Sequence, residues 1–553
     1  MPSGAADARR TTDAAGAGRA RTGTAAAFAW RGAVWGGLIG LVAAVWLQVQ
    51  PRVLAMAGTV FSGAPQGTDQ WTYFAMVRAI MRSPTWITYS YPFDLWWPTP
   101  PVLFQPVLAA LAALARVAGL PLAFEAGRVL GAAASGAALA LMAHRLAPGR
   151  GWRGWLAVAM GLGGGVFWVA STAQTVALAG WPSLPWTMQA RMMGHLFMWT
   201  PYAAQNVFYP LEALYHALVL GALAALLMRR DAVALVLGGA AVFSNPFSGG
   251  ALLACVVPWC AWNTLAAGPG AGRARAARRL ALWLGLATLA LGYYGWFLRQ
   301  WPALHDLSRI YTGALHEWLT PWQMAMMWTP FGAGLVWSVA ARRGRRLVWG
   351  NTNWRLMGLL AVSQVALAQQ ALVLGQWAVQ PMHFNRGYMA VGMAALFWRA
   401  ARAWARNPRV VPRWAVLAVA LTLPDQAFFF VYLAEDGMRT GAVPVAAERI
   451  VEDLRRLPGR LVVHGTWEYN SYLAAETDHQ PFVNDEAMVI PFAAERQRRL
   501  RETVVRGGRL EELGIDALIA MEDSPLTRLA LGHGWRVLAP GNGWMAVYVR
   551  PGL

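Results

Sequence analysis

The sequence predicts an all-α polytopic membrane domain of about eleven transmembrane helices, followed by a small C-terminal α/β domain outside the cytoplasm. Three observations lead to this fold class. The 553 residues are 57% hydrophobic and only 13% charged, whereas soluble proteins average about 25% charged residues. Only eight of the 27 acidic residues lie between residues 14 and 434, whereas acids are frequent from residue 435 onward, where strand and helix patterns alternate. This composition excludes a disordered chain and an ordinary water-soluble enzyme.

The basic residues are all arginines, 47 of them, and the formal net charge is +20. A nucleic-acid-binding surface would interleave these arginines with aromatic residues on one solvated face. Instead they form short clusters between apolar runs, as in the cytoplasmic loops of polytopic proteins. We therefore expect the lipid bilayer, and no nucleic acid, as a partner. The 31 tryptophans fit an interfacial aromatic belt, and stacking on sugar rings is the alternative for those in outer loops.

The N-terminal residues 1–29 are rich in Ala, Gly, Thr and Arg, which predicts a flexible cytoplasmic tail. The predicted transmembrane domain follows at 30–434 and includes a large first outer loop at 49–122. Its first span begins near Gly32 and acts as an uncleaved signal anchor. Ten further apolar runs lie at about 123–143, 154–171, 207–228, 232–245, 247–262, 280–298, 321–341, 356–374, 388–404 and 414–434. The segment SNPFSGG, from Ser244, separates two short runs either as a helix break that lines a cavity or as a simple turn.

Residues 101–118 in the first outer loop are apolar but carry Gln105, Pro106 and Arg116. They form either a span or a helix on the membrane surface. The surface alternative, with a cytoplasmic N-terminus, leaves slightly more arginines on the cytoplasmic side, so the positive-inside rule prefers it without deciding between the two. Both alternatives place residues 435–553 outside the cytoplasm. We expect a multi-pass protein of a bacterial-type inner membrane.

The C-terminal residues 435–553 form the predicted extracytoplasmic α/β domain. Period-2 apolar patterns predict strands at RLVVHG, PFVND, DALIAM, WRVLA and WMAVYV. NSYLAAET and the charged amphipathic stretch AAERQRRLRETVV predict helices. This region has no Gly-rich phosphate loop, so its sequence indicates no nucleotide site.

Asp69 is the first candidate for chemistry. It ends a short polar turn in the first outer loop, directly before an amphipathic helix that carries Tyr73 and Arg78. A carboxylate just above the bilayer, desolvated by aromatic neighbours, is suited to take a proton from an acceptor hydroxyl. Asp is also a favoured residue at helix starts, so a structural role is the alternative.

The first outer loop has an acid, an aromatic residue, a small residue and an Arg. The Pro-rich WWPTPP, an apolar helix ending in Gly and a span that opens with an Arg follow. This order resembles the first outer loop of the GT-C membrane glycosyltransferases, which include the dolichyl-phosphate-mannose and aminoarabinose transferases. The resemblance implies an inverting hexosyl or pentosyl transferase that moves a sugar from a polyprenyl-phosphate donor to a glycan, lipid or protein acceptor. It also implies that Asp69 is the catalytic base, and we add Tyr73 and Arg78 as substrate-binding residues.

A second basic candidate is Arg386, in the outer sequence QPMHFNRGYMAVG. It resembles an Arg that opens a late span in this superfamily, where it meets the lipid phosphate. A guanidinium binds phosphate through two parallel hydrogen bonds, although an Arg that merely reaches the membrane interface is the alternative. His383 lies three residues earlier and could assist in binding substrate.

The second acid of the site departs from the pattern of the family. Many members carry an acid in the outer loop between the third and fourth spans, but residues 172–206 contain none. The nearest acid is Glu212, which shares a helix face with His216 at i, i+4. An intramembrane carboxylate suggests function, and a structural hydrogen-bonded pair is the alternative. We predict a catalytic role for Glu212 and a substrate-binding role for His216.

A later outer loop holds two His-acid pairs, His305 with Asp306 and His316 with Glu317. They could bind a divalent metal together with Asp69, but their spacing matches no metal motif, so a solvated loop is the alternative. The sequence implies no other cofactor. Two further functions stay open. One is a transporter or flippase of lipid-linked intermediates, for which the expected inverted repeats are not evident. The other is a non-catalytic scaffold with the GT-C fold.

Overall fold

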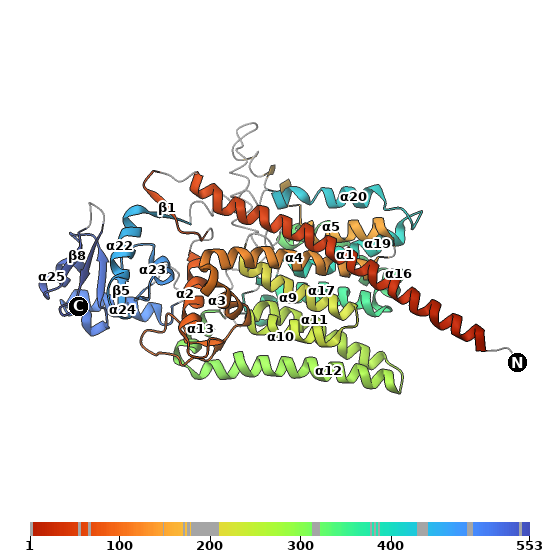
Figure 1. Cartoon of the computed structure of the whole chain (residues 1–553), viewed down its shortest axis with the longest axis horizontal. Helices are drawn as coiled ribbons and strands as arrows, with labels where there is room; N and C mark the ends of the chain where they lie inside the picture. The colour runs from red at the N-terminus through yellow and green to blue at the C-terminus, as the bar shows by residue number, and fades with distance from the viewer. Residues whose placement is uncertain are drawn as a thin grey trace.

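The computed structural model describes most of the chain. The described residues are 4–53, 57–64, 68–147, 149–166, 168–169, 172–173, 177, 209–311, 321–375, 379–380, 383–384, 387–427, 441–483, 490–540 and 545–553. Helices predominate and run broadly along the long axis of the molecule, with the N-terminus at one end and a small sheet at the other (Figure 1).

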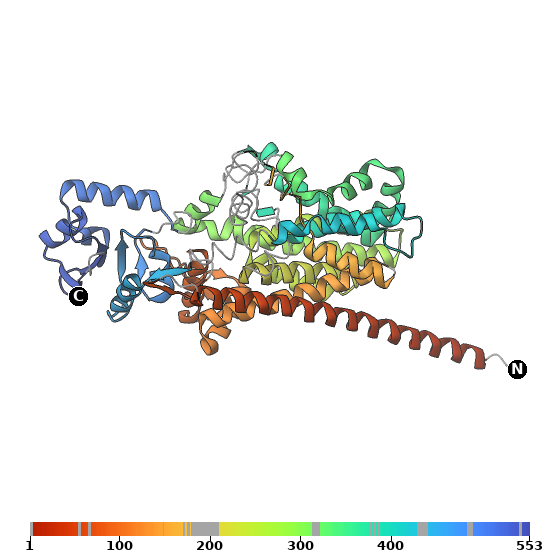
Figure 2. The same cartoon turned by 90° about the horizontal axis from the view of Figure 1, so that it is seen from above.

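The first helix, α1, runs without interruption over Gly4–Val53. Residues 4–29 therefore continue a helix, where the sequence led us to expect a flexible tail. Ala and Arg are among the best helix formers, so this Ala-rich and Arg-rich stretch can extend the helix beyond the apolar segment. The apolar part, Thr24–Gln50, is long enough to cross a membrane. Figure 2 shows the preceding part of α1 projecting beyond the other helices.

Five helices in the described residues are long and apolar enough to cross a membrane, so the chain has the character of a multi-pass membrane protein. They are Thr24–Gln50 in α1, α4 (Leu120–Leu146), α9 (Pro210–Leu227), α11 (Pro246–Ala266) and the segment Ala271–Gln300, which contains α12 (Ala271–Ala290). Each coincides with an apolar run that the sequence analysis predicted as a span. The total of about eleven spans stays a prediction.

The other predicted runs contain shorter helices wherever they are described. These are α5 (Arg150–Leu162), α10 (Asp231–Ser244), α14 (Pro321–Trp328), α15 (Gly332–Ala340), α17 (Thr352–Ala368), α18 (Ala371–Leu374), α19 (Gly387–Trp404) and α20 (Arg413–Ala420). The basic helix α16 (Arg342–Trp349) lies between α15 and α17. The predicted run 321–341 is divided between α14 and α15, and the SNPFSGG segment is a helix break between α10 and α11.

The apolar helix of the first outer loop, α3 (Pro106–Ala118), has 13 residues. At 1.5 Å per residue it is about 20 Å long, whereas the hydrocarbon core of a bilayer is about 30 Å thick. It ends at Gly119, whose φ of 80° suits a residue without a side chain. From there the chain enters α4. The helix packs on α2 (Thr68–Arg82) and α4, and its length favours the surface alternative for residues 101–118.

Helix α4 packs closely against both α1 and α9 because small residues face each other. A Cβ atom added to Gly36 of α1 would overlap the backbone oxygen of Ala132 in α4. One added to Gly131 of α4 would overlap the backbone of Ala213 in α9. Small residues let helix backbones pack directly in a membrane. This packing fixes the N-terminal part of α9 against the middle of α4.

The C-terminal residues form a five-stranded sheet in the order β6-β5-β7-β9-β8. Its strands are β5 (Val462–Gly465), β6 (Gln480–Pro481), β7 (Ala517–Ala520), β8 (Arg536–Ala539) and β9 (Ala546–Val549). Strand β5 is parallel to β6 and β7, and β9 is antiparallel to β7 and β8. The helices are α22 (Val445–Arg455), α23 (Asn470–Glu476), α24 (Ala493–Arg506) and α25 (Pro525–Gly532), with a 3-10 turn at Leu510–Leu513. Most of the stretches predicted as strands and helices here coincide with these elements, whereas β6 overlaps the predicted strand PFVND only at Pro481.

The first outer loop joins this C-terminal region directly. Strand β1 (Thr59–Phe61) pairs antiparallel with β4 (Ala442–Pro444). Helix α2 packs against α23. A small antiparallel pair, β2 (Thr88–Tyr89) with β3 (Leu103–Phe104), lies within the loop. The loop and the C-terminal region therefore share one buried apolar cluster at the end of the bundle that carries the candidate site.

Candidate active site

Helix α2 presents Asp69 in its first turn, where the carboxylate is exposed. The helix is fixed by its buried residues: the Phe74 ring lies 4.7 Å from that of Phe124 in α4, and the Trp71 ring lies 5.2 Å from that of Tyr472 in α23. The helix dipole favours a negative charge at this position. Tyr73, one turn after Asp69, is partly exposed. Asp69 is therefore an accessible carboxylate on a helix that packs through its apolar residues against α4 and α23.

Arg78 lies on the opposite side of α2 from Asp69. Nine residues separate the two positions, which is about two and a half helical turns. The Arg78 guanidinium is 3.5 Å from the carboxylate of Glu476, which also accepts a hydrogen bond of 3.2 Å from Arg455. Burial lowers the pKa of Arg78, and the neighbouring Glu476 opposes that shift. The structure thus brings Arg78 to the C-terminal region and not to Asp69.

The predicted pair of Glu212 and His216 is present at the N-terminal end of α9. Pro210 occupies the first turn, where its missing N–H costs no hydrogen bond. His216 Nε2 lies 3.1 Å from Glu212 Oε2, and both side chains are buried. Their neighbours Leu211 and Tyr215 belong to the apolar cluster that holds α2. The pair therefore lies at the N-terminal end of a candidate span, beside the elements that carry Asp69.

The break between α10 and α11 also contacts the first outer loop. The Ser244 hydroxyl accepts a hydrogen bond of 3.1 Å from the backbone N–H of Val107 in α3, and the Asn245 side chain caps α11. Phe247 stacks on His383, with 4.6 Å between ring centroids. His383 is thereby placed at the helix break. Arg386 lies outside the described residues.

His305 and Asp306, the metal candidates, lie in a helix, α13 (Pro302–Tyr311), and not in the solvated loop considered from the sequence. Asp306 Oδ2 accepts a hydrogen bond of 2.7 Å from the backbone N–H of Phe492, so it anchors the C-terminal region. Within the residues that the structure describes, no group of three His, Cys, Asp or Glu side chains could hold a metal ion. His316 and Glu317 lie outside those residues, as does nearly all of the loop 172–206.

Sequence reasoning missed a buried polar contact between the first outer loop and α24. Asp94 accepts hydrogen bonds from the hydroxyl of Thr99, at 2.7 Å, and from its backbone N–H. Arg496, 1% exposed, donates to the backbone oxygens of Phe93, at 2.9 Å, and Phe482, at 3.1 Å. Burial raises the pKa of Asp94 and lowers that of Arg496 to about 10. An Arg-rich amphipathic helix was the only sequence signal for this contact.

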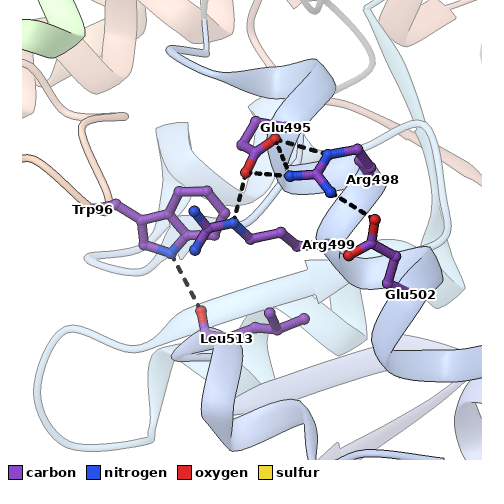
Figure 3. A network of polar contacts seen from close by, with 6 residues as sticks. All are labelled: Trp96, Glu495, Arg498, Arg499, Glu502 and Leu513. Atoms are coloured by element: carbon purple, nitrogen blue, oxygen red, sulfur yellow. Dashed lines mark hydrogen bonds and ion pairs between the residues drawn. The ribbon is translucent and has the colours of Figure 1, made fainter. Parts of the chain in front are cut away.

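Figure 3 shows the neighbouring surface, where the guanidinium of Arg499 lies over the ring of Trp96, 4.6 Å from its centroid. Trp96 also donates to the backbone oxygen of Leu513 at 3.4 Å. Glu495 orients Arg499 from the other side at 2.7 Å. This tryptophan of the first outer loop is therefore part of the contact with the C-terminal region.

No family model and no curated protein matches this sequence. Among solved structures, the chain is similar to the oligosaccharyltransferase AglB of Archaeoglobus fulgidus in complex with an inhibitory peptide and a dolichol-phosphate. The TM-score is 0.47, the identity 12%, and the match covers 94% of this chain and 74% of that one. The oligosaccharyltransferase of the same organism with Zn and sulfate gives a TM-score of 0.48 and 12% identity, over 93% and 73% of the two chains.

A third similar structure is ArnT from Cupriavidus metallidurans in the apo state. Its TM-score is 0.42 and its identity 14%, with 93% of this chain and 97% of that chain covered. Both proteins are GT-C glycosyltransferases, the superfamily that the first outer loop resembles. Because these TM-scores lie below 0.5, the functional proposal rests on the residues of this chain.

Proposed function

We propose that the protein is a membrane glycosyltransferase that moves a sugar from a polyprenyl-phosphate donor to a glycan, lipid or protein acceptor. The reaction takes place on the outer face of a bacterial-type inner membrane, with the N-terminus in the cytoplasm and residues 435–553 outside. The observation that carries this proposal is the position of Asp69. Its carboxylate is exposed in the first turn of a helix that is packed firmly on α4 and α23.

In the proposed step, Asp69 takes the proton of the acceptor hydroxyl while the hydroxyl oxygen attacks the anomeric carbon of the donor. The bond between that carbon and the phosphate oxygen breaks, the polyprenyl phosphate leaves, and the anomeric configuration inverts. A carboxylate on a fixed helix can act as a general base because its position does not change as the acceptor binds. The aromatic face of Tyr73, one turn away and partly exposed, lies beside the acceptor.

The residues proposed to bind the donor phosphate, and the second polar group of the site, come from elements other than α2. Arg386 is proposed to bind the donor phosphate, with His383 close by at the break between α10 and α11. Glu212 and His216 are proposed as the second polar group of the site, with Glu212 acting in catalysis and His216 in substrate binding. The burial of this pair at the end of a span supports a functional role for it, because a buried carboxylate in a membrane is costly to keep. Arg78 faces the C-terminal region and is left out of this reaction scheme.

The test compares membranes that contain the wild-type protein, Asp69→Asn or Asp523→Asn. Asp523 is an exposed aspartate far along the chain and serves as the matched control. Mass analysis of glycans and glycolipids, from cells with and without the protein, first identifies the product. We expect Asp69→Asn to abolish this product while inserting normally, and Asp523→Asn to retain it. Wild-type transfer by Asp69→Asn would remove Asp69 from the mechanism, and no glycan change on deletion would refute a transferase.

A further inference from the structure

A pocket of about 330 Å³ lies where α2 meets the C-terminal region. Helix α2 contributes Arg78 and Arg82 from one face, and Arg460 and His479 come from the segments on either side of α23. This face of α2 points away from Asp69, as the two and a half turns between Asp69 and Arg78 require. The pocket is therefore separate from the candidate active site.

The charges around this pocket do not balance. Three guanidinium groups line it, whereas Asp478 supplies its only lining carboxylate and pairs with Arg82. Glu476 lies next to the pocket and divides its carboxylate between Arg78 and Arg455. Arg460 donates to a backbone oxygen, that of Pro92, at 3.0 Å. The lining as a whole is positively charged.

The polar groups that line the pocket can still donate hydrogen bonds to a ligand. His479 adds no positive charge, because its Nδ1 accepts from the N–H of Leu461 and its Nε2 faces the oxygen of Leu454 at 2.7 Å. Within the described structure, the buried Nε atom of Arg78 has no hydrogen-bond partner. The pKa of Arg82 is lowered first by burial and then by the charges of Arg78 and Arg460, so Arg82 is repelled by both of the other guanidiniums.

We propose that this pocket binds a phosphate group through Arg78, Arg82 and Arg460. A phosphate brings negative charge and several acceptor oxygens, and the planar guanidinium group binds such oxygens in pairs. The volume admits a phosphate together with part of the molecule that carries it. The same chemistry occurs in free inorganic phosphate and in the head group of an anionic lipid. The proposal is independent of the transferase reaction.

The first experiment measures inorganic phosphate binding by calorimetry, with the full chain in nanodiscs of zwitterionic lipid. Arg460→Ala is the main variant, because it removes one guanidinium without taking an ion-pair partner from Asp478 or Glu476. Arg501→Ala, at an exposed position of α24, is the matched control. We expect saturable binding by the wild-type chain and the control, weaker by at least about tenfold in Arg460→Ala, and weaker in each protein as salt is added.

The second experiment distinguishes a lipid source. The same proteins are reconstituted with phosphatidylglycerol, and the lipid retained by each is measured by native mass spectrometry. Retention that falls with Arg460→Ala but not with Arg501→Ala identifies a lipid head group as the ligand. Binding confined to the first experiment identifies a soluble phosphate. If neither experiment shows binding that depends on Arg460, the proposal is wrong.

A folding control keeps both results interpretable. Thermal unfolding of Arg460→Ala should match that of the wild-type chain. Should this variant unfold early, Arg82→Gln provides a second substitution, because its amide keeps a donor for Asp478 while removing the positive charge. Wild-type affinity for phosphate and lipid in a folded Arg82→Gln protein would equally contradict the proposal.

Discussion

Arg78 in α2 and Glu476 in α23 lie 3.5 Å apart and join the first outer loop to the C-terminal region. The same carboxylate accepts a hydrogen bond from Arg455. Burial raises the pKa of Glu476, although both arginines oppose that shift. The contact thus holds the helix of Asp69 against the C-terminal region at some cost in desolvation.

The first prediction measures this contact with a double-mutant cycle. We expect Arg78→Ala and Glu476→Ala each to lower the free energy of unfolding in detergent. Because the two side chains interact, the double variant should lose less than the sum, by a coupling energy of about 1 kcal/mol. The exposed pair Arg498 and Glu502 is the control, with an expected coupling energy of about 0.3 kcal/mol. Additive effects at Arg78 and Glu476 would show that the contact does not stabilise the fold.

The second prediction concerns Glu212, whose substitution by Gln keeps the shape of the side chain. If Glu212 acts in the reaction, Glu212→Gln should lower the transfer rate by about a hundredfold. The unfolding temperature of this variant should change little, since the amide oxygen of the substituted side chain can still accept a hydrogen bond from His216. Transfer rate and thermal unfolding are measured on the same preparation. A fall in stability with unchanged transfer per folded molecule would assign the pair a structural role.

The third prediction concerns the buried ion pair of α4. Arg128, fully buried, lies 2.6 Å from Glu125, which also accepts a hydrogen bond of 2.9 Å from Gln48 of α1. Glu125→Gln leaves the guanidinium without its counter-ion and should destabilise the protein by about 3 kcal/mol. Gln48→Ala removes one hydrogen bond to the carboxylate and one to the backbone oxygen of Gly63, and should cost less, about 1 to 2 kcal/mol. Equal losses for both variants, measured by unfolding in detergent, would contradict this order.

The fourth prediction compares two adjacent glycines of α1. A Cβ on Gly36 would overlap the backbone of α4, so Gly36→Ala should destabilise the helix pair by about 1 to 3 kcal/mol. A Cβ on Gly37 would meet the Cβ of Ala133 at an ordinary 3.5 Å. Gly37→Ala should therefore be neutral or stabilising by about 0.5 kcal/mol, because Ala favours helix more than Gly does. Thermal unfolding of both variants tests this prediction, and a similar loss in both would contradict it.

The sequence predicted local structure well in segments where the apolar residues recur with a single regular spacing. The apolar runs that became α4, α9, α11 and α12, and the strands β5, β7 and β9, each follow from the spacing of apolar residues within a few turns or strand positions. The length of α1 was missed, because the Gly and Thr content indicated a tail while the Ala and Arg content favoured a helix. Local composition alone did not decide between these two tendencies.

Contacts between distant segments could not be predicted from such patterns. Nothing in residues 59–61 indicates pairing with residues 442–444, because many short apolar stretches could form the same ladder. Arg78 was predicted to bind substrate from its place after Asp69, yet helix geometry directs it to Glu476. The i, i+4 contact of Glu212 with His216 was predictable because it lies within one helix.

The last prediction concerns pH and His464 in β5, which is 7% exposed. Burial lowers its pKa to about 4, whereas the ordinary value is 6.5. The unfolded chain therefore takes up the proton first, so the stability of the C-terminal region is complete above pH 6.5 and falls as the pH drops toward 4. The loss should reach about 2 kcal/mol at pH 5.

Hydrogen-exchange protection of the β5 and β7 amides measures this loss of stability. His464→Gln should reduce this pH dependence to the part contributed by His479, whose pKa is also lowered by burial. His533→Gln, at a partly exposed position, should retain the full dependence. Equal protection of the wild-type chain at pH 7 and pH 5 would show that His464 does not control the stability of the sheet.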